Sequence, residues 1–316
     1  MSTEHTMRAI SQDTLGGPEV LKEVALPRPE PRTNEVLVRV RAAGVNPTDW
    51  KHRATGGFLG AAPFVLGWDV SGVVEAVGVG VARFRPGDEV FGMLSYPFGH
   101  GSHAEYVTAP ARTFAHKPAA LDHTRAAALP LVSLTAWQAL VETAEVGPGQ
   151  RVLIHAAAGG VGHVATQIAK ARGAYVIGTA SAGKHDFLRE IGVDEPLDYR
   201  ETDITEAVKD VDVVLDTLGG ATSVDSLRVL RPGGIVVSIL PVGSDELYEE
   251  AEQLGVRAVR MLVDASHSGM RAIAELVEAG KLRPTIAGTF PLAEAAEAHR
   301  IGELGRTAGK LVLLVD

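Results

Sequence analysis

The chain has 316 residues, of which 46% are hydrophobic and 22% charged, and its formal net charge at pH 7 is −9. This length suits two domains, the composition excludes extensive disorder, and an acidic balance without a run of Lys or Arg argues against a nucleic-acid surface. Because the chain has no cysteine, disulfides, thiolate metal sites and cysteine nucleophiles are excluded. No apolar stretch reaches the ~18 residues of a membrane span and the first residues are polar, so a cytoplasmic location is predicted.

The first part of the chain, residues 7–120, consists of short alternating segments separated by Pro and Gly turns. Glu35–Val40, Val70–Gly78 and Glu89–Met93 are predicted strands, and Pro86–Asp88 is a turn. Strands of this kind, joined by short turns, pair into sheets with one buried face. This part is therefore predicted to be a β-rich domain.

The middle of the chain contains a strand, a glycine turn and a helix in that order. The apolar run from Arg151 suits a buried parallel strand, and it leads through Ala156, Gly159 and Gly162 into the helical spacing of Ala165–Ala171. In such a turn, backbone N–H groups and the helix dipole can bind the pyrophosphate of a dinucleotide. The same small residues also occur in ordinary strand-to-helix turns, so the elements that follow are needed to distinguish a dinucleotide-binding turn from an ordinary one.

Further strands follow at the distances that a nucleotide-binding sheet requires. Ala174–Ala180, Val211–Leu215 and Gly234–Leu240 are predicted strands, and Lys184–Ile191 and Ser223–Leu230 are predicted helices between them. Strands that alternate with helices favour a doubly wound parallel sheet, with ligands at the carboxyl ends of its strands. The fold class is therefore predicted to be α/β.

The last part of the chain is predicted to hold two amphipathic helices and a strand. The helices are Met270–Ala279 and Ala293–Glu303, and the strand is Lys310–Val315. Because this strand lies far along the chain from the parallel strands, we expect it to return to the first domain.

Six ordered motifs resemble the zinc-independent quinone oxidoreductase (zeta-crystallin-like) branch of the medium-chain dehydrogenase/reductase superfamily. They are Ala42–Asp49, Leu66–Val74, Phe84–Val90, Ala128–Pro130 with Thr135–Trp137, Ala156–Gly162 and Gly309–Leu313. The resemblance covers essentially the whole chain. It implies a GroES-like β-rich catalytic domain over residues 1–124 and 265–316, and a Rossmann NADP-binding domain over residues 125–264.

The residue types argue against a zinc site. Zinc-dependent relatives carry Cys and a His-Glu pair where this chain has Asn46 and Trp68–Asp69, and neither Asn nor Trp is a plausible substitute ligand. No metal site is predicted. His100 and His103 are interpreted as solvent-exposed loop residues rather than ligands.

The predicted cofactor is NADPH. NAD-binding folds usually place an Asp or Glu about 20 residues beyond the glycine turn, whereas the segment Gly178–Lys184 offers a hydroxyl and an ammonium instead. In the family that the chain resembles, the positions of Ser181, Lys184 and Tyr199 surround the 2′-phosphate. A surface role for Lys184, and packing of Tyr199 against the sheet, stay open as alternatives.

The resemblance also implies the rest of the cofactor site. Asn46 and Thr135 would lie near the nicotinamide ribose and phosphate, although Asn46 could instead cap the turn before Pro47 and Thr135 could begin a helix. The full set of implied cofactor-binding residues is Asn46, Thr135, Ala157, Gly159, Gly160, Val161, Gly162, Ser181, Lys184, Tyr199, Leu218, Leu240, Val242 and Lys310.

The implied activity is hydride transfer to quinones or to the double bond of α,β-unsaturated carbonyl compounds. Candidates for the acceptor pocket are Asn46, Phe58, Trp68 and Phe98, although aromatic residues of a β domain are more often core. No catalytic residue is assigned. Because family members often have a Tyr near the position of Phe58 and this chain does not, a proton from water is expected. Asp49 and Asp69 are interpreted as structural.

Two other functions stay open from the sequence. One is a nucleotide-binding redox sensor or structural protein with little turnover, because no firm acid–base residue stands out. The other is a zinc-independent enoyl-thioester reductase, which would need a basic entrance. For either enzyme the substrate is a small molecule, with no nucleic acid or membrane as partner. A homodimer that pairs through Ala258–Val263 is expected by the same resemblance.

Overall fold

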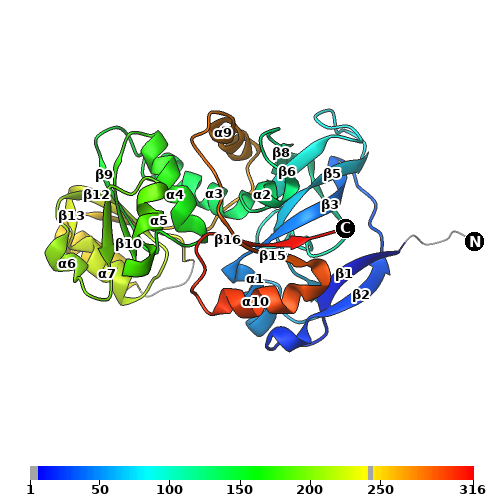
Figure 1. Cartoon of the computed structure of the whole chain (residues 1–316), viewed down its shortest axis with the longest axis horizontal. Helices are drawn as coiled ribbons and strands as arrows, with labels where there is room; N and C mark the ends of the chain where they lie inside the picture. The colour runs from blue at the N-terminus through cyan, green and yellow to red at the C-terminus, as the bar shows by residue number, and fades with distance from the viewer. Residues whose placement is uncertain (1–5, 241–244) are drawn as a thin grey trace, which may run out of the picture. The chain divides into compact units, whose positions relative to one another are not determined.

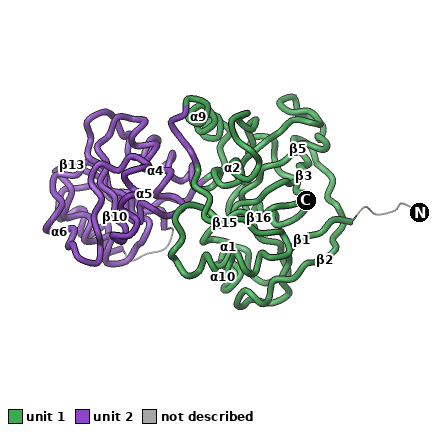
Figure 2. Tube along the Cα trace, in the orientation of Figure 1, with its two compact units in different colours: residues 1–131, 264–279, 284–316 green, residues 132–263, 280–283 purple. Residues whose placement is uncertain are grey.

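The chain divides into two compact units in a computed structural model that describes residues 6–240 and 245–316. Unit 1 contains the chain up to residue 131 together with residues 264–279 and 284–316, and unit 2 contains residues 132–263 and 280–283 (Figure 2). The helix α3 (Pro130–Trp137) contains the point where the chain passes from unit 1 to unit 2. Unit 1 is thus built from segments near both ends of the described chain.

Unit 1 contains two β-sheets. The larger has seven strands, in the order β15-β16-β3-β5-β6-β8 with β7 paired to β3, and the smaller has the order β2-β1-β4. Apart from the parallel pair β15 and β16, neighbouring strands are antiparallel. The bounds are β1 Thr6–Gln12, β2 Lys22–Pro27, β3 Glu35–Val45, β4 Phe64–Val65, β5 Asp69–Val77, β6 Glu89–Met93, β7 Tyr106–Pro110, β8 Phe114–His116, β15 Ile286–Pro291 and β16 Lys310–Leu314.

Short helices cover these sheets. They are η1 Pro18–Val20, α1 Pro47–Thr55, η2 Ala111–Thr113, α2 His123–Ala127, α9 His267–Glu278, η5 Leu292–Glu294 and α10 Ala295–Glu303. Pro47 opens α1 at a position where its missing N–H costs no hydrogen bond, and Gly56 ends the helix with a φ of 79°. Helix α10 lies beside α1 in unit 1 (Figure 1), where the rings of Trp50 and His299 are 6.3 Å apart.

Unit 2 is a six-stranded parallel sheet with helices between its strands. The strand order is β11-β10-β9-β12-β13-β14. From β9 the chain adds strands toward one edge of the sheet, and from β12 it adds them toward the other, so the order of addition reverses between β9 and β12. The strands are β9 Arg151–Ile154, β10 Tyr175–Ala180, β11 Glu195–Asp198, β12 Val211–Asp216, β13 Leu230–Ser238 and β14 Arg257–Arg260. The helices are η3 Gln138–Thr143, α4 Gly160–Ala171, η4 Ala182–Lys184, α5 His185–Glu190, α6 Ile204–Ala207, α7 Ala221–Leu227 and α8 Glu246–Leu254.

The predicted α/β class, with a β-rich domain and a doubly wound parallel sheet, is confirmed. The strand at Lys310 returns to the first domain as predicted, because β16 pairs with β3 in the register Leu311 to Val45. Several predicted element ends were wrong by a few residues: α7 spans Ala221–Leu227 rather than Ser223–Leu230, and β13 spans Leu230–Ser238 rather than Gly234–Leu240. Helix α7 ends before Leu230 because Leu230 already pairs with Val211 as the first residue of β13.

The core of unit 2 forms where the parallel strands present the same face. Leu153, Ile177, Val214 and Val236 come from four neighbouring strands and are buried in one cluster. Fully buried parallel strands need apolar side chains on both faces, which explains their nearly continuous Val and Ile content. This core fixes the ends of β9 and β12, from which the candidate nucleotide site extends. No helix in the described ranges is long and apolar enough to cross a membrane.

Candidate active-site residues and nucleotide-binding loop

The glycine loop of unit 2 connects β9 directly to α4. Ala156 adopts a φ of 47°, and Gly159 N donates to Ala156 O at 2.8 Å, so the chain reverses within a few residues before α4 begins at Gly160. A Cβ atom added at Gly162 would lie 2.3 Å from Ala156 O and 2.6 Å from Ala157 Cα. Glycine is therefore required for the helix to approach the loop this closely.

This loop can bind an anion. Gly160, Val161 and Gly162 form the first turn of α4, where backbone N–H groups have no partner earlier in the helix, whereas Ala157 N and Gly159 N already donate to Thr179 O at 2.9 Å and to Ala156 O at 2.8 Å. The loop also follows one of the two strands at which the sheet order reverses. In open α/β sheets such a reversal is where ligands bind, so the local geometry fits the pyrophosphate of a dinucleotide.

The turn after β12 forms the other side of this reversal. Asp216 accepts hydrogen bonds from Leu218 N at 2.9 Å, Gly219 N at 3.0 Å and Ser223 Oγ at 2.5 Å. Burial opposes ionisation, yet the hydrogen bonds from Gly219, Ser223 and Leu218 hold the pKa of Asp216 below its usual value. The turn is therefore rigid, and it presents Leu218 with 52% of its surface exposed.

Of the two residues predicted after β13, one can be placed. Leu240 lies next to the turn after β12, because a Cβ atom added at Gly219 would be 2.4 Å from Leu240 Cδ1. Val242 lies outside the described residues. Thr135 is buried in the last turn of α3, so it does not begin that helix.

The predicted 2′-phosphate residues lie at the ends of β10 and β11. Ser181 precedes the short helix η4, Lys184 is its last residue, and Tyr199 follows β11 with 57% of its surface exposed. The Arg200 guanidinium carbon lies 5.6 Å from the centre of the Tyr199 ring. One end of the sheet thus carries a hydroxyl, an ammonium, a phenol and a guanidinium in neighbouring segments.

A carboxylate also lies in this region, although the segment Gly178–Lys184 contains none. Asp198, the last residue of β11, accepts hydrogen bonds from Ala182 N at 2.8 Å and Arg200 N at 2.9 Å. The hydrogen bond from Arg200 N is the largest cause that lowers the pKa of Asp198, so its carboxylate is charged at neutral pH. It joins the loops after β10 and β11. Sequence spacing missed it because Asp198 comes from the neighbouring strand.

In unit 1, Asn46 belongs to a buried cluster of polar side chains. Its Nδ2 donates to Asp69 Oδ2 at 2.9 Å, its Oδ1 accepts from Lys310 Nζ, and its backbone N donates to Asp49 Oδ2 at 2.6 Å. Lys310 Nζ also donates to Val45 O at 2.8 Å and lies 3.5 Å from Asp69 Oδ2. Both the nitrogen and the oxygen of the Asn46 amide are therefore hydrogen-bonded, and the ammonium that bonds the oxygen belongs to Lys310, which is 3% exposed.

Burial controls the ionisation of this cluster. Burial raises the pKa of the Asp49 carboxyl well above its usual value, and it lowers the pKa of the Lys310 ammonium although Asp69 and Asp49 oppose that shift. Asp69 Oδ1 accepts from Leu131 N at 2.6 Å. Asp49 and Asp69 thus tie α1, β5 and the start of α3 together, as the sequence interpretation expected of structural carboxylates.

A ring cluster lies on the other side of α1. His52, Phe58, Trp68 and Tyr96 pack with their ring centres 5.1–6.4 Å apart, from His52–Trp68 at 5.1 Å to His52–Tyr96 at 6.4 Å. Phe58 is 43% exposed, whereas Trp68 is fully buried and donates Nε1–H to Pro97 O at 3.2 Å. Phe98 is 74% exposed and takes part in none of these ring pairs. Of the predicted pocket residues, Phe58 and Trp68 belong to this cluster, where each packs on His52 and Tyr96.

Sequence reasoning missed three polar residues in this cluster. Thr48 Oγ1 lies 3.0 Å from Tyr96 Oη and 3.1 Å from His52 Nδ1. The available signal was the spacing of Thr48 and His52, which are four residues apart and therefore on one face of a helix. Tyr96 comes from a loop after β6, and no local pattern could have linked it to α1.

The interpretation of His103 as a solvent-exposed loop residue was wrong. His103 is fully buried, because its backbone N and O bond to Leu66 and Ile10 on segments that cover it. His100 is half-buried and its Nδ1 contacts Val65 O at 2.7 Å. Within residues 6–240 and 245–316, no group of three or more His, Asp or Glu side chains is arranged to hold a metal ion.

Acid is expected to destabilise unit 1 through His103. Burial lowers the pKa of His103 from 6.5 to about 4, so the unfolded chain binds more protons than the folded chain between these values. The resulting stability is therefore fully present above pH 6.5 and is lost as the pH falls toward 4, with a loss of roughly 3 kcal/mol at most. Urea unfolding followed by Trp fluorescence should show this loss. The variant His103→Gln should reduce the loss, whereas His116→Gln, at an exposed position, should not. Part of the loss should persist in His103→Gln, because burial also lowers the pKa of the neighbouring His299.

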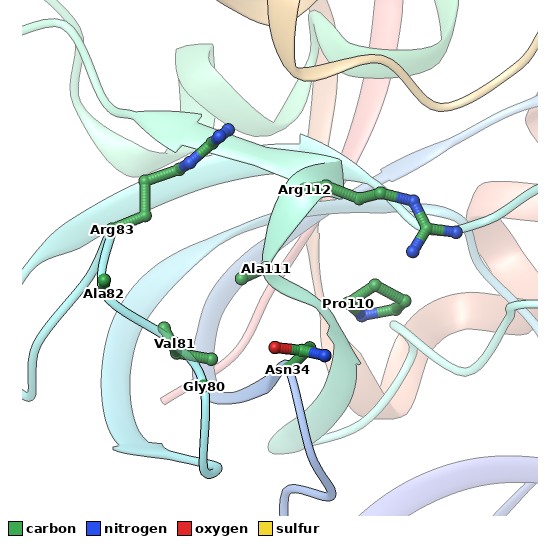
Figure 3. Close-up of a pocket in the computed structure, with 8 residues that line it drawn as sticks. All are labelled: Asn34, Gly80, Val81, Ala82, Arg83, Pro110, Ala111 and Arg112. Atoms are coloured by element: carbon green, nitrogen blue, oxygen red, sulfur yellow. The ribbon is translucent and has the colours of Figure 1, made fainter.

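A surface pocket of about 380 Å³ lies elsewhere in unit 1 (Figure 3). Its walls come from the residue before β3, the loop after β5 and the end of β7 with η2. They comprise Asn34, Gly80, Val81, Ala82, Arg83, Pro110, Ala111 and Arg112. None of these residues belongs to the predicted site, and the pocket carries no functional assignment.

Comparison with known proteins places the chain in a family. The alcohol dehydrogenase GroES-like domain matches residues 32–119, and the zinc-binding dehydrogenase family matches residues 191–313. The quinone oxidoreductase of Sus scrofa is 35% identical over 328 residues, which covers 98% of this chain and 98% of the relative.

Solved structures agree over the whole length. The quinone oxidoreductase of Coxiella burnetii has a TM-score of 0.94 at 40% identity and covers 99% of this chain and 100% of its own. The Escherichia coli quinone oxidoreductase complexed with NADPH has a TM-score of 0.89 at 31% identity, with coverage of 97% and 99%. The chain therefore belongs to the quinone oxidoreductase branch of the medium-chain dehydrogenase/reductase superfamily, with a GroES-like unit 1 and a Rossmann unit 2.

Proposed function

We propose that this protein is an NADPH-dependent oxidoreductase that reduces quinones, or the carbon–carbon double bond of α,β-unsaturated carbonyl compounds, without zinc. The observation that carries the proposal is the glycine loop after β9, whose close approach to α4 at Gly162 leaves the backbone open to a pyrophosphate. The proposal is supported by the NADPH complex of the Escherichia coli relative. Bound NADPH would supply the hydride.

The proposed residue roles follow from their placement. Gly160, Val161 and Gly162 would hold the pyrophosphate through backbone N–H groups, and Ala157 and Gly159 would line the loop around it.

Three other groups of residues would complete the cofactor site. Ser181, Lys184 and Tyr199 would surround the 2′-phosphate, and Leu218 and Leu240 would contact the cofactor at the strand ends. Asn46 and Thr135 would orient the nicotinamide ribose, with Lys310 fixing the Asn46 amide.

The acceptor class is proposed from the family and from the ring cluster. Several relatives are named quinone oxidoreductases. Phe58 and Tyr96 present partly exposed ring surface in unit 1, and such surface suits a flat, electron-poor acceptor. Hydride transfer to such an acceptor requires positioning and exclusion of water rather than an activated nucleophile on the protein.

Cofactor oxidation, followed by absorbance, tests the proposal. NADPH and NADH would each be tried against a benzoquinone, a naphthoquinone, an enone and a 2-alkenal, with and without a chelator. We expect turnover with NADPH that the chelator does not reduce. Lys184→Ala should raise the KM for NADPH by at least about tenfold, because a lost charge-assisted phosphate contact exceeds ~1.4 kcal/mol, and should leave NADH nearly unchanged.

The control is Lys281→Ala, which removes an exposed lysine elsewhere in unit 2. Equal losses for NADPH and NADH in Lys184→Ala would contradict the 2′-phosphate assignment. NADPH binding without turnover on any acceptor would instead favour the nucleotide-binding sensor.

Assembly and location stay predictions. Strand β14 is an edge strand of the unit 2 sheet, so its outer N–H and C=O groups could pair with a second copy. On this basis a homodimer is proposed that pairs through the segment Ala258–Val263. The cytoplasmic location is proposed from the sequence alone.

A further inference from the structure

Three side chains of unit 1 form a continuous chain of polar contacts that the cofactor site does not use. His52 Nδ1 lies 3.1 Å from Thr48 Oγ1, and Thr48 Oγ1 lies 3.0 Å from Tyr96 Oη. Thr48 and Tyr96 are half-buried, whereas His52 is only 4% exposed. The contacts therefore lead from the interior of unit 1 to the partly exposed end of the ring cluster.

The contacts assign a direction to the hydrogens. His52 Nδ1 is also 2.8 Å from Thr48 O, and because a carbonyl oxygen only accepts, Nδ1 must carry the hydrogen. The single Nδ1 hydrogen faces Thr48 O and, as a longer second contact, Thr48 Oγ1, so the Thr48 Oγ1 hydrogen is directed to Tyr96 Oη and not to Nδ1. The Tyr96 hydroxyl hydrogen is left to point toward a bound molecule.

The inner end of the chain is shielded from solvent. His52 Nε2 is buried and has no hydrogen-bond partner in the described part of the chain. It lies against Gly57, where an added Cβ atom would be 2.8 Å from Nε2. His52 therefore holds Thr48 in place and does not exchange its proton with water.

The outer end lies on the surface proposed to hold the acceptor. The Tyr96 ring packs edge-on against Phe58, with ring centres 6.3 Å apart, and against Trp68 at 5.3 Å. Phe58 is 43% exposed, so a flat molecule that rests on it would lie beside the Tyr96 hydroxyl.

From this geometry we infer that Tyr96 is the proton donor to the reduced acceptor, and that Thr48, held by His52, donates the hydrogen bond that stabilises the Tyr96 phenolate. The inference rests on the proposed function. It replaces water, which the sequence suggested as the direct donor because Phe58 is not a tyrosine. Tyr96 would act as a catalytic acid, and Thr48 and His52 as positioning residues behind it.

The proton transfers balance. Hydride addition leaves the acceptor as an enolate or a hydroquinone anion. The Tyr96 O–H bond breaks as the new O–H or C–H bond of the product forms. The Tyr96 phenolate, stabilised by the hydrogen bond from Thr48 Oγ1, then takes a proton from solvent at the partly exposed end of the ring cluster, while Thr48 and His52 keep their hydrogens. The net change is one hydride and one solvent proton added to the acceptor.

The ionisation of these groups is compatible with the roles. Burial raises the pKa of Tyr96, and the hydrogen bond with Thr48 opposes that shift because it stabilises the phenolate. Burial lowers the pKa of His52, the contact with Thr48 O opposes this shift, and the nearby His100 lowers the pKa further. His52 is therefore neutral and keeps its hydrogen on Nδ1. Of the charged neighbours of His52 on α1, Lys51 is exposed and Arg53 is paired with Glu303.

The test compares two acceptors. An enolate is a stronger base than a hydroquinone anion, so proton donation matters more for an enone than for a benzoquinone. Tyr96→Phe should lower kcat at least about 100-fold with the enone and much less with the benzoquinone. A merely structural role would lower both equally. Tyr106→Phe, which removes a hydroxyl from β7 of the same unit, is the control.

Thr48 variants test the hydrogen bond to Tyr96 without disturbing the rings. Thr48→Val should lower kcat with the enone and leave the KM for NADPH unchanged, whereas Thr48→Ser, which keeps the hydroxyl, should retain activity. Thr55→Val is the matched control, because Thr55 lies on the same helix and bonds only to Lys51 O at 2.8 Å. These variants keep the inference testable if Tyr96→Phe fails to fold.

Two results would overturn the inference: equal losses with the enone and the benzoquinone in Tyr96→Phe, or full activity in both Tyr96→Phe and Thr48→Val. If the unsubstituted protein turned over neither acceptor, the proposed function would fail first and the inference with it.

Discussion

Replacing Lys310 with methionine is expected to lower the free energy of unfolding of unit 1 by about 3–5 kcal/mol, because it leaves a buried carboxylate without its counter-charge. Lys310 and Asp69 are 3% and 0% exposed, and their charged atoms lie 3.5 Å apart. The ammonium also donates to Val45 O and Asn46 Oδ1, and both acceptors would lose their partner. Urea unfolding followed by Trp50 and Trp68 fluorescence measures the change.

A double-mutant cycle separates the ion pair from simple loss of packing. Asp69→Asn alone should also destabilise the unit, since it leaves the buried ammonium unpaired. The combined variant Lys310→Met with Asp69→Asn carries neither charge, and it should cost clearly less than the sum of the two single changes. If the two effects simply added, the buried pair would not be coupled, and the account of how Asn46 is held would be incorrect.

Gly162→Ala is expected to weaken NADPH binding at least about tenfold, equivalent to ~1.4 kcal/mol, and to destabilise unit 2 by about 1–3 kcal/mol. The added methyl group would meet Ala156 O at 2.3 Å and Ala157 Cα at 2.6 Å, and both are backbone atoms that cannot turn aside. Helix α4 would have to move away from β9, which changes the N–H groups proposed to hold the pyrophosphate. Isothermal titration and thermal unfolding measure the two effects.

The control for this substitution is Gly183→Ala. Gly183 has an ordinary φ and nothing within 4 Å of the added Cβ atom, and it is next to Lys184. It should therefore leave stability and NADPH affinity nearly unchanged. If Gly162→Ala were as mild as Gly183→Ala, the close approach of α4 would not matter for binding.

The sequence predicted those features that depend on residues near one another in the chain. The turn at Ala156–Gly162 was predictable because a strand, small residues and a helix follow within one segment, and the return of β16 followed from an apolar run with no place in the parallel sheet. Family membership was predictable because six motifs occur in order. Each of these signals is local or depends only on order.

The sequence could not predict contacts between distant segments. His103 is buried by strands that come from residues near Ile10 and Leu66, Asp198 enters the region of Ser181 from a neighbouring strand, and Tyr96 meets Thr48 across 48 residues. Composition and spacing carry no information on such pairs in a single sequence. The candidate proton donor, Tyr96, could therefore be identified from the structure but not from the sequence.

The pairing of β16 with β3 also determines when the protein can finish folding during synthesis. Lys310 bonds to Asn46 across 264 residues, so the buried polar cluster of unit 1 stays open until nearly all of the described chain has been made. Nearly all of unit 2, by contrast, is one continuous segment that is complete by residue 263. Domains generally fold as units as they emerge. Unit 2 can therefore form before Lys310 has been synthesised, when Asn46 and Asp69 still lack the Lys310 ammonium as a partner. The strand β3 therefore lacks its neighbour β16 for most of translation.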